Sequence, residues 1–329
     1  MKKYFKSIDP NILRLLLVLL MFTLLAGITK TGKFMNVGNF QSIAVQLSEY
    51  GLMALGVGIC MISGGIDLST VYIANLTGII SGLIMQRMSI AAAGNAYIFL
   101  AVGVAILVGT LCGTFNGFLV SKLRIPAMLA TLGTSQLFLG IAVVLSHGST
   151  VSGIPKAYTD LGRLSIFGIP ASFLVFIVAA VVLTIIMSKS KYGKRTYLVG
   201  TNAKAASFAG INNVSVLIRS YMISGILSAF AGLLSLARIN SAKADFGTSY
   251  TMLTILIVVL GGVNPDGGFG SIPGVTIAVV ILQLISSYLN MFPNISNYYR
   301  DLIWGVALIA VLVINYTINK RKTDKLSKT

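Results

Sequence analysis

Charged residues are scarce in this chain, and acidic residues are the scarcest of them. Only 10% of the 329 residues are charged, and the 8 Asp and Glu stand against 25 Lys and Arg. Soluble domains carry roughly a quarter charged residues. Because 56% of the residues are hydrophobic and the mean hydropathy is +0.89, the composition excludes a soluble domain and indicates a membrane protein.

The sequence also lacks the side chains and motifs of an enzyme. His147 is the only histidine, and the two cysteines, Cys60 and Cys112, lie in apolar runs without metal-ligand spacing. HExxH, GxSxG and paired membrane glutamates are absent. The segment from Gly27 to Lys33 (GITKTGK) resembles a P-loop, but Phe34 replaces the magnesium-binding Ser or Thr. We therefore expect no catalytic site, no metal and no cofactor bound by this chain.

What the chain does contain is a series of apolar segments separated by short polar ones. A helix needs about 20 apolar residues to cross a bilayer. We predict an all-α polytopic membrane protein that forms one domain over residues 1–329. The ten predicted spans are 12–28, 45–62, 68–85, 97–121, 126–146, 171–187, 216–237, 251–261, 272–290 and 299–318.

The basic residues favour one orientation of these spans. With the N-terminus inside, most Lys and Arg fall on the inner side, as the positive-inside rule requires. The interval 188–214 and the basic tail 319–329 are then both cytoplasmic, and 147–170 is the largest outer segment. The start of the chain resembles a signal peptide, but a clean cleavage site is missing. A retained first helix is therefore the favoured interpretation.

Two glycine-rich segments interrupt the apolar pattern, one in each half of the chain. The first reads ISGGIDLST from Ile62, with Gly64 and Gly65, and the second reads LGGVNPDGGFGSIPG from Leu260. The second contains four glycines of interest, which are Gly261, Gly262, Gly267 and Gly268. Paired breaks of this kind are typical of transporters built from two related halves.

The first break contains a carboxylate, Asp67, with two open interpretations. It can cap the following helix, where the helix dipole favours negative charge, or it can face a pathway or ligand. Asp67 is also the only acidic residue that we expect well inside the spans.

The fourth span contains a polar residue and a row of glycines. Asn116 either bonds to a neighbouring helix, which we favour, or lines a pathway. Gly109, Gly113 and Gly117 recur every four residues on one helix face. Small residues at that spacing predict a close helix–helix contact and require no further function.

The longest polar interval is 188–214, which is basic and has no acidic residue. Within it we predict a short helix over 203–209, with Asn202 as N-cap and Gly210 in the left-handed conformation after the end. A helix this short is marginal in water. A partner protein that holds it and an ordinary basic loop are the two interpretations of this interval.

Four motifs in order make the chain resemble a known family, the permease subunits of ribose-type bacterial sugar ABC importers, in the branched-chain amino acid/sugar permease superfamily. The resemblance covers residues 50 to 314. The motifs are SGGIDLS with Asp67 and Ser69, Asn116-Gly117 followed by KLRIP and ATLGT, the segment from Gly200 to Ile211, and Gly261-Gly262 with GGFGS from Gly267.

The resemblance implies a type II-like permease fold in the bacterial inner or plasma membrane, with both termini cytoplasmic. It further implies a second permease copy or paralogue, two cytoplasmic ATPase subunits that bind ATP and Mg, an extracytoplasmic sugar-binding protein, and no nucleic acid. The segment meeting the ATPase would contain Thr201, Asn202, Ala205, Ala206, Phe208 and Gly210. Ribose is the default solute, with xylose, galactose, autoinducer-2 and nucleosides as alternatives. An ion-coupled secondary transporter is the second class that we consider.

Overall fold

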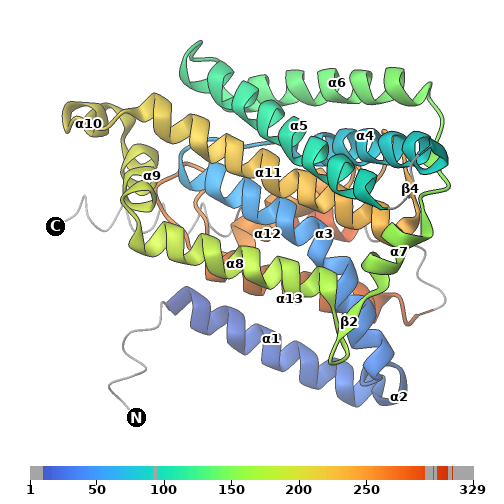
Figure 1. The fold of residues 1–329 in the computed structure, drawn as a ribbon. Helices are drawn as coiled ribbons and strands as arrows, with labels where there is room; N and C mark the ends of the chain where they lie inside the picture. Colours follow the sequence, from blue (N-terminus) through green and yellow to red (C-terminus); the bar gives the residue numbers. More distant parts are fainter. Residues whose placement is uncertain (1–9, 92–94, 293–298, 300–301, 310–312, 314–329) are drawn as a thin grey trace.

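The computed structural model describes residues 10–91, 95–292, 299, 302–309 and 313, and nearly all of its regular structure is helical. Its long helices run roughly along one common direction, and the shorter α9 lies across them (Figure 1). In chain order they are α1 Pro10–Thr29, α2 Thr31–Phe34, α3 Val37–Ile62, α4 Thr70–Ala91, α5 Ala96–Ser121, α6 Ala127–Ser146, α7 Lys156–Arg163, α8 Ala171–Lys189, α9 Lys191–Thr201, α10 Ala203–Phe208, α11 Asn213–Ile239, α12 Tyr250–Leu260 and α13 Ile272–Leu289.

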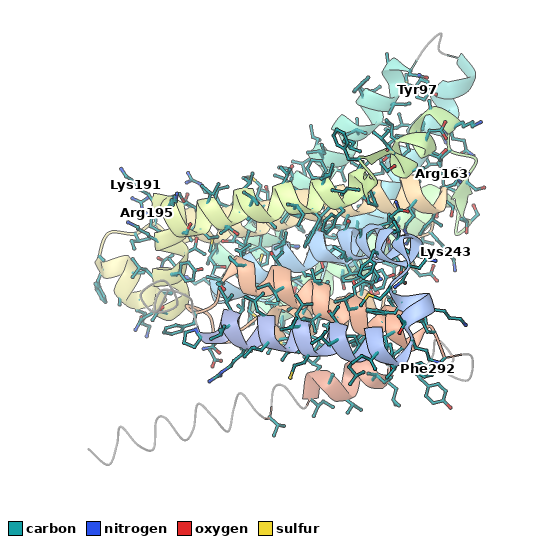
Figure 2. The ribbon with its side chains drawn as sticks, turned by 90° about the horizontal axis from the view of Figure 1, so that it is seen from below. Tyr97, Arg163, Lys191, Arg195, Lys243 and Phe292 are labelled. Carbon is teal, nitrogen blue, oxygen red and sulfur yellow. The ribbon has the colours of Figure 1, made fainter. Side chains whose placement is uncertain are left out.

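Four short strands depart from the all-helical prediction. The strand β1 (Val151–Ser152) pairs antiparallel with β4 (Ser241–Ala242), and β2 (Ser165–Ile166) pairs antiparallel with β3 (Ile169–Pro170). The strands lie beside α7, at the opposite end of the helices from α9 and α10 (Figure 1). We call these two ends the α7 end and the α10 end. In Figure 2, Arg163 and Lys243 mark the first end, and Lys191 and Arg195 mark the second.

Seven of the described helices are long and apolar enough to cross a membrane: α1, α3, α5, α6, α8, α11 and α13. The protein is therefore a multi-pass membrane protein, but three of the ten predicted spans are not among these seven. The third is α4, whose 22 residues include the buried polar side chains Asn75, Thr77 and Ser81. The eighth is α12, with only 11 residues. Much of the tenth, like the basic tail 319–329, lies outside the described residues.

The core is built around α3, whose residues are all buried from Leu47 to Ile62. Outer helices instead turn large apolar side chains away from the protein, as Met21 and Ile28 do on α1, with 64% and 80% of their surfaces exposed. Exposed apolar faces of this size would be unfavourable in water. They suit a hydrocarbon environment, where the apolar side chains of the outer helices are in contact with lipid.

The glycine row of the fourth span is a close helix–helix contact, as predicted. A Cβ atom on Gly109 would lie 2.6 Å from the carbonyl oxygen of Gly225 on α11, and one on Gly117 would lie 2.6 Å from the Cα of Ile218. Because only glycine avoids these overlaps, α5 and α11 approach each other backbone to backbone. This contact places Asn116 of α5 close to α11 and close to the first glycine break.

Candidate functional site

The polar interval 188–214 forms two helices instead of one loop. The Ser190 hydroxyl accepts a hydrogen bond from the Gly193 amide at 3.0 Å and caps α9. The Asn202 side chain accepts from the Ala205 amide at 3.0 Å and caps α10. Gly210 has a φ of +76° and follows the end of α10. The predicted cap, short helix and left-handed glycine are therefore confirmed, although α10 ends at Phe208, one residue earlier than predicted, and α9 was not foreseen.

The face of α10 that packs against the protein is small. Ala206 is buried with Val199 of α9 and Val216 of α11 in a separate apolar cluster. The Asn213 side chain also donates a hydrogen bond of 2.6 Å to the Ala203 carbonyl. Phe208 points away from this cluster, with 94% of its surface exposed. A partner can reach the exposed residues Ala205 and Phe208, whereas Ala206 holds α10 against the protein.

The helix α9 is fixed by two tyrosines. The Tyr192 hydroxyl shares a hydrogen bond of 2.9 Å with the Ser220 hydroxyl of α11. Burial raises the pKa of Tyr192 to about 12, so the hydroxyl stays neutral. The Tyr197 hydroxyl donates to the Gly270 carbonyl at 2.9 Å, and burial raises the pKa of Tyr197 as well. The two tyrosines therefore join α9 to α11 and to the second glycine break.

Both glycine breaks meet at the end of α9, in a cluster that we call the glycine junction: Gly64, Gly200, Gly267 and Gly268. The Gly268 amide donates to the Ile62 carbonyl at 2.9 Å, which joins the two breaks directly. A Cβ on Gly267 would lie 2.7 Å from the Gly64 Cα and 2.9 Å from the Gly200 oxygen. Gly64 and Gly267 also have φ of +91°, a region that favours glycine. Three chain segments therefore touch through backbone atoms, one residue before Thr201.

Asp67 is part of a buried hydrogen-bond network in the first break. One carboxylate oxygen accepts from the Ser69 amide at 3.0 Å and the Ser69 hydroxyl at 2.7 Å, and the other accepts from the Ser224 hydroxyl of α11 at 2.7 Å. The Asn116 amide of α5 donates to the Ser69 hydroxyl at 2.7 Å. Asp67 therefore shapes the turn immediately before α4 instead of capping its first turn, and Asn116 bonds to this turn, as the interhelical interpretation predicts.

The backbone of the first break is also bonded to α6. The Thr131 hydroxyl donates to the Ile66 carbonyl at 3.0 Å. A Cβ on Gly65 would meet Ala127 of α6 at 3.2 Å and would overlap the Tyr221 hydroxyl of α11. The first break is thus held by α5, α6 and α11 together.

The two breaks end their preceding helices in the same way. After α3, the Gly65 amide bonds to the Cys60 carbonyl at 3.0 Å, and after α12 the Val263 amide bonds to the Val258 carbonyl at 3.2 Å. The left-handed glycines at the two ends are Gly64 and Gly262. The two helix ends are equivalent when Gly64 is aligned with Gly262. The Asn11 side chain of α1 donates to the Gly261 carbonyl at 3.1 Å and holds the second break.

A second buried acid, Glu49, was missed because we expected Asp67 alone inside the spans. Glu49 lies on α3 with 2% of its surface exposed. Its carboxylate accepts from Arg238 of α11 at two positions, the Nε atom and the Nη2 atom, the latter at 2.9 Å. A carboxylate inside an apolar helix requires such a partner. Since Glu49 falls inside the predicted span 45–62, this requirement could have identified it. In the described part of the chain, no three His, Cys, Asp or Glu side chains gather as metal ligands.

Long apolar helices, two broken segments that meet inside the protein and a protruding capped helix define a transport-type membrane protein. Comparison with known families agrees. The chain belongs to the family described as "Branched-chain amino acid transport system / permease component", whose model matches residues 39–312. It is therefore a permease component and not an enzyme.

Three curated relatives are permeases of import or transport systems. The ribose import permease protein of Bacillus subtilis (strain 168) is 32% identical over 284 residues, covering 85% of each chain. The autoinducer 2 import system permease protein of Yersinia pseudotuberculosis (strain YPIII) is 31% identical, over 80% of this chain and 78% of the relative. The L-arabinose transport system permease protein of Escherichia coli (strain K12) is 28% identical, over 86% and 84%. No solved structure gave a match.

Proposed function

We propose that this chain is the membrane-spanning subunit of an ATP-driven importer for a monosaccharide or a similar polyhydroxylated solute, and that α10 couples it to a separate ATPase. The observation that carries the proposal is the position of α10. It projects an almost fully exposed Phe208, while the residue before Thr201 is enclosed in the glycine junction. A force applied to α10 would therefore reach both glycine breaks.

The proposed orientation places the α10 end in the cytoplasm. Five basic residues gather on α8 to α10: Lys189, Lys191, Lys194, Arg195 and Lys204. Under the positive-inside rule, such a cluster marks the cytoplasmic side, so the α7 end faces outward. With ten spans in two related halves, both termini would be cytoplasmic. The matching helix ends at Gly64 and Gly262 support the two-halves arrangement.

The proposed partners follow from what the chain can and cannot supply. Its P-loop-like segment, 27–33, forms the end of α1 and part of α2, so ATP and Mg would be bound by the ATPase subunits. A second permease copy or paralogue would complete the membrane unit, and an extracytoplasmic binding protein would dock at the α7 end. The relatives with ribose, arabinose and autoinducer 2 in their names support a polyhydroxylated solute.

The ion-coupled alternative is less well supported. It would require a buried ionisable group that is available to a coupling ion. Both buried acids of the described residues are already engaged, Asp67 with Ser69 and Ser224, and Glu49 with Arg238. The relatives are named as permease proteins of import or transport systems, which also fits an importer subunit.

The coupling role is tested by Phe208→Ala, with Phe167→Ala as the matched control. Phe167 is fully exposed too, but it lies between β2 and β3 at the α7 end. Truncating an anchoring aromatic side chain costs about 2 kcal/mol or more, which is about thirtyfold in affinity. We expect Phe208→Ala to weaken capture of the purified ATPase by about this factor and to reduce ATP-driven uptake into proteoliposomes, while Phe167→Ala leaves ATPase capture unchanged.

Two results would contradict the proposal. Equal ATPase capture by the two variants would show that α10 is not the coupling helix. Ion-driven uptake by the chain alone, without ATPase or binding protein, would refute the proposal that this chain belongs to an ATP-driven importer.

A further inference from the structure

A polar cavity of about 480 Å³ opens at the α7 end, within the roughly 300–1,000 Å³ range of small-molecule sites. It lies where the first turns of α3 face α7, the β2–β3 turn and the end of α11. Six side chains with hydrogen-bonding groups line it: Gln41, Ser42, Gln46, Arg163, Ser165 and Arg238. None of them belongs to the coupling helix or to the glycine breaks.

The side chain of Gln46 is oriented by a buried chain of hydrogen bonds. The Tyr50 hydroxyl donates to the Gln283 amide oxygen at 2.6 Å, and the Gln283 amide nitrogen donates to the Gln46 oxygen at 3.1 Å. The oxygen of Gln46 is therefore occupied from the α13 side. Among the described residues its amide nitrogen has no hydrogen-bond partner, so it can donate to an occupant of the cavity.

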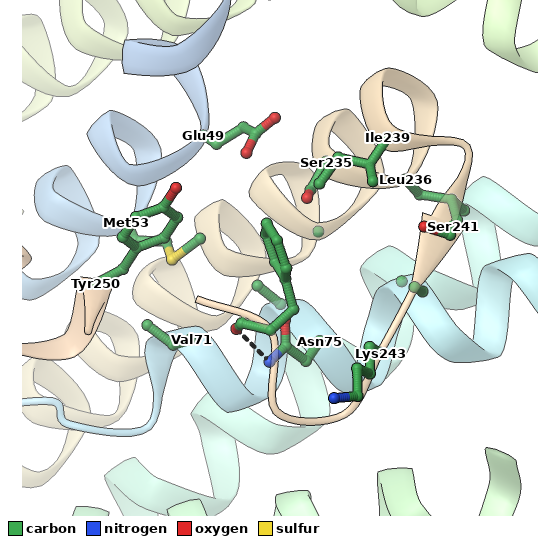
Figure 3. A pocket seen from close by; sticks show the side chains of 15 residues that line it. Glu49, Met53, Val71, Asn75, Ser235, Leu236, Ile239, Ser241, Lys243 and Tyr250 are labelled. Carbon is green, nitrogen blue, oxygen red and sulfur yellow. Dashed lines mark hydrogen bonds between the residues drawn. The ribbon is translucent and has the colours of Figure 1, made fainter. Parts of the chain in front are cut away.

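The guanidinium of Arg238 forms the inner end of this cavity and is held in place by Glu49. The same Glu49 also lines a smaller cavity of about 40 Å³ between α3, α4 and α11, beside Asn75 and Tyr250 (Figure 3). The ion pair thus stands between the two cavities. Because Glu49 neutralises Arg238, the guanidinium presents oriented donors with little net charge at this end.

We propose that the outer cavity is a binding station for a neutral polyhydroxylated solute, with Gln46 and Arg238 as its inner donors. Hydroxyl groups both donate and accept, and the lining offers both functions. The Ser42 hydroxyl donates to the Gly38 carbonyl at 2.9 Å, so its oxygen can accept a hydrogen bond from the solute. The Gln41 amide nitrogen donates to the Gly168 carbonyl at 3.0 Å, which leaves the amide oxygen as a second acceptor. An anion would use only the donors, and an apolar molecule would leave the whole set unpaired.

This inference rests on the proposed function for the side of the membrane and for the class of solute. The test uses Ser42→Cys as a reporter in the complete transporter, because the native Cys60 and Cys112 are buried. Thr150→Cys is the matched control, since Thr150 is exposed near β1 and does not line the cavity. A membrane-impermeant maleimide is applied from outside, with ribose or L-arabinose at concentrations up to about 100 mM. This concentration would saturate even a weak site whose dissociation constant for the sugar is about 1 mM.

We expect ribose or arabinose to slow labelling of Ser42→Cys at least about tenfold and to leave Thr150→Cys unchanged. Adding Gln46→Ala should raise the half-protecting concentration by about three- to tenfold, the effect of one neutral hydrogen bond. Gln86→Ala is its control, because Gln86 donates to the Ser152 carbonyl outside the cavity. A merely structural role of Gln46 would change the labelling rate without solute, which we expect to stay constant.

The outcomes distinguish a failure of this inference from a failure of the proposed orientation or function. If Thr150→Cys is not labelled from outside, the proposed orientation is wrong. If it is labelled but no sugar protects Ser42→Cys while ATP-driven uptake persists, the binding station is wrong and the proposed function stands. Stronger protection by gluconate than by ribose would identify an anion site and overturn the inference. Equal protection of both cysteines would show that the sugar effect is non-specific.

Discussion

Replacing Gly200 by Ala tests whether the glycine junction holds the structure together. A Cβ at this position would overlap the Ile62 carbonyl oxygen and lie 2.5 Å from the Gly268 nitrogen. Both neighbours are backbone atoms, so α9 must move away. Overpacking of this kind costs about 1–3 kcal/mol, and loss of the Gly268–Ile62 hydrogen bond adds about 1 kcal/mol. The gain from Ala in a helix offsets about 0.5–1 kcal/mol, which leaves a net loss of about 2 kcal/mol.

The assay follows from the two native thiols. Cys60 is completely buried and Cys112 nearly so, so a thiol-reactive dye reports unfolding of the detergent-solubilised chain. A loss of about 2 kcal/mol corresponds to a fall of about 4–8 °C in Tm for a large domain. Gly133→Ala on α6 is the matched control, because no atom lies within 4 Å of the position of its Cβ, and its Tm should stay or rise. If both variants melt at the same temperature, backbone contact at the junction does not stabilise the fold.

Two further substitutions test the buried carboxylates by the same assay. Asp67→Ala removes the acceptor of three hydrogen bonds and should cost about 3 kcal/mol or more, whereas Asp245→Ala, in an exposed pair with Lys243, should cost less than about 1 kcal/mol; similar losses would refute the network. Arg238→Gln should cost about 3–5 kcal/mol because it leaves the buried Glu49 carboxylate unpaired, whereas Glu49→Gln should cost less because the side chain of Arg238 is 31% exposed and lines the outer cavity. The double variant should cost at least about 1 kcal/mol less than the sum, and strict additivity would show that the pair is not coupled.

The parts of the candidate site that could be predicted depend on local signals. An Asn followed by small helix formers and a Gly is sufficient to locate α10, because cap, helix and stop all lie within nine residues. The glycine row on α5 is likewise a property of one helix face. In both cases the residues that determine the structure are neighbours along the chain.

The parts that could not be predicted depend on distant contacts. The helix α9 contains two glycines and a basic face, and it is held by Tyr192 and Tyr197 through partners that lie 28 and 73 residues further along the chain. The glycine junction joins residues near 64, 200 and 267, so no single segment indicates it. The helix α4 forms where the third span was predicted, but it is not among the seven helices that are apolar enough to cross a membrane, because polar side chains such as Asn75 lower its mean hydropathy.

The absence of side chains at the glycine junction has a mechanical consequence. Where side chains separate two backbones, a displacement is partly absorbed because rotamers change and gaps close. At Gly64, Gly200 and Gly267 there is no such compliant layer, and the three backbones form a stiff linkage. Displacement of α10 by an ångström would therefore appear at both membrane breaks with little loss of amplitude. The same stiffness implies that the two breaks move at the same time and not one after the other.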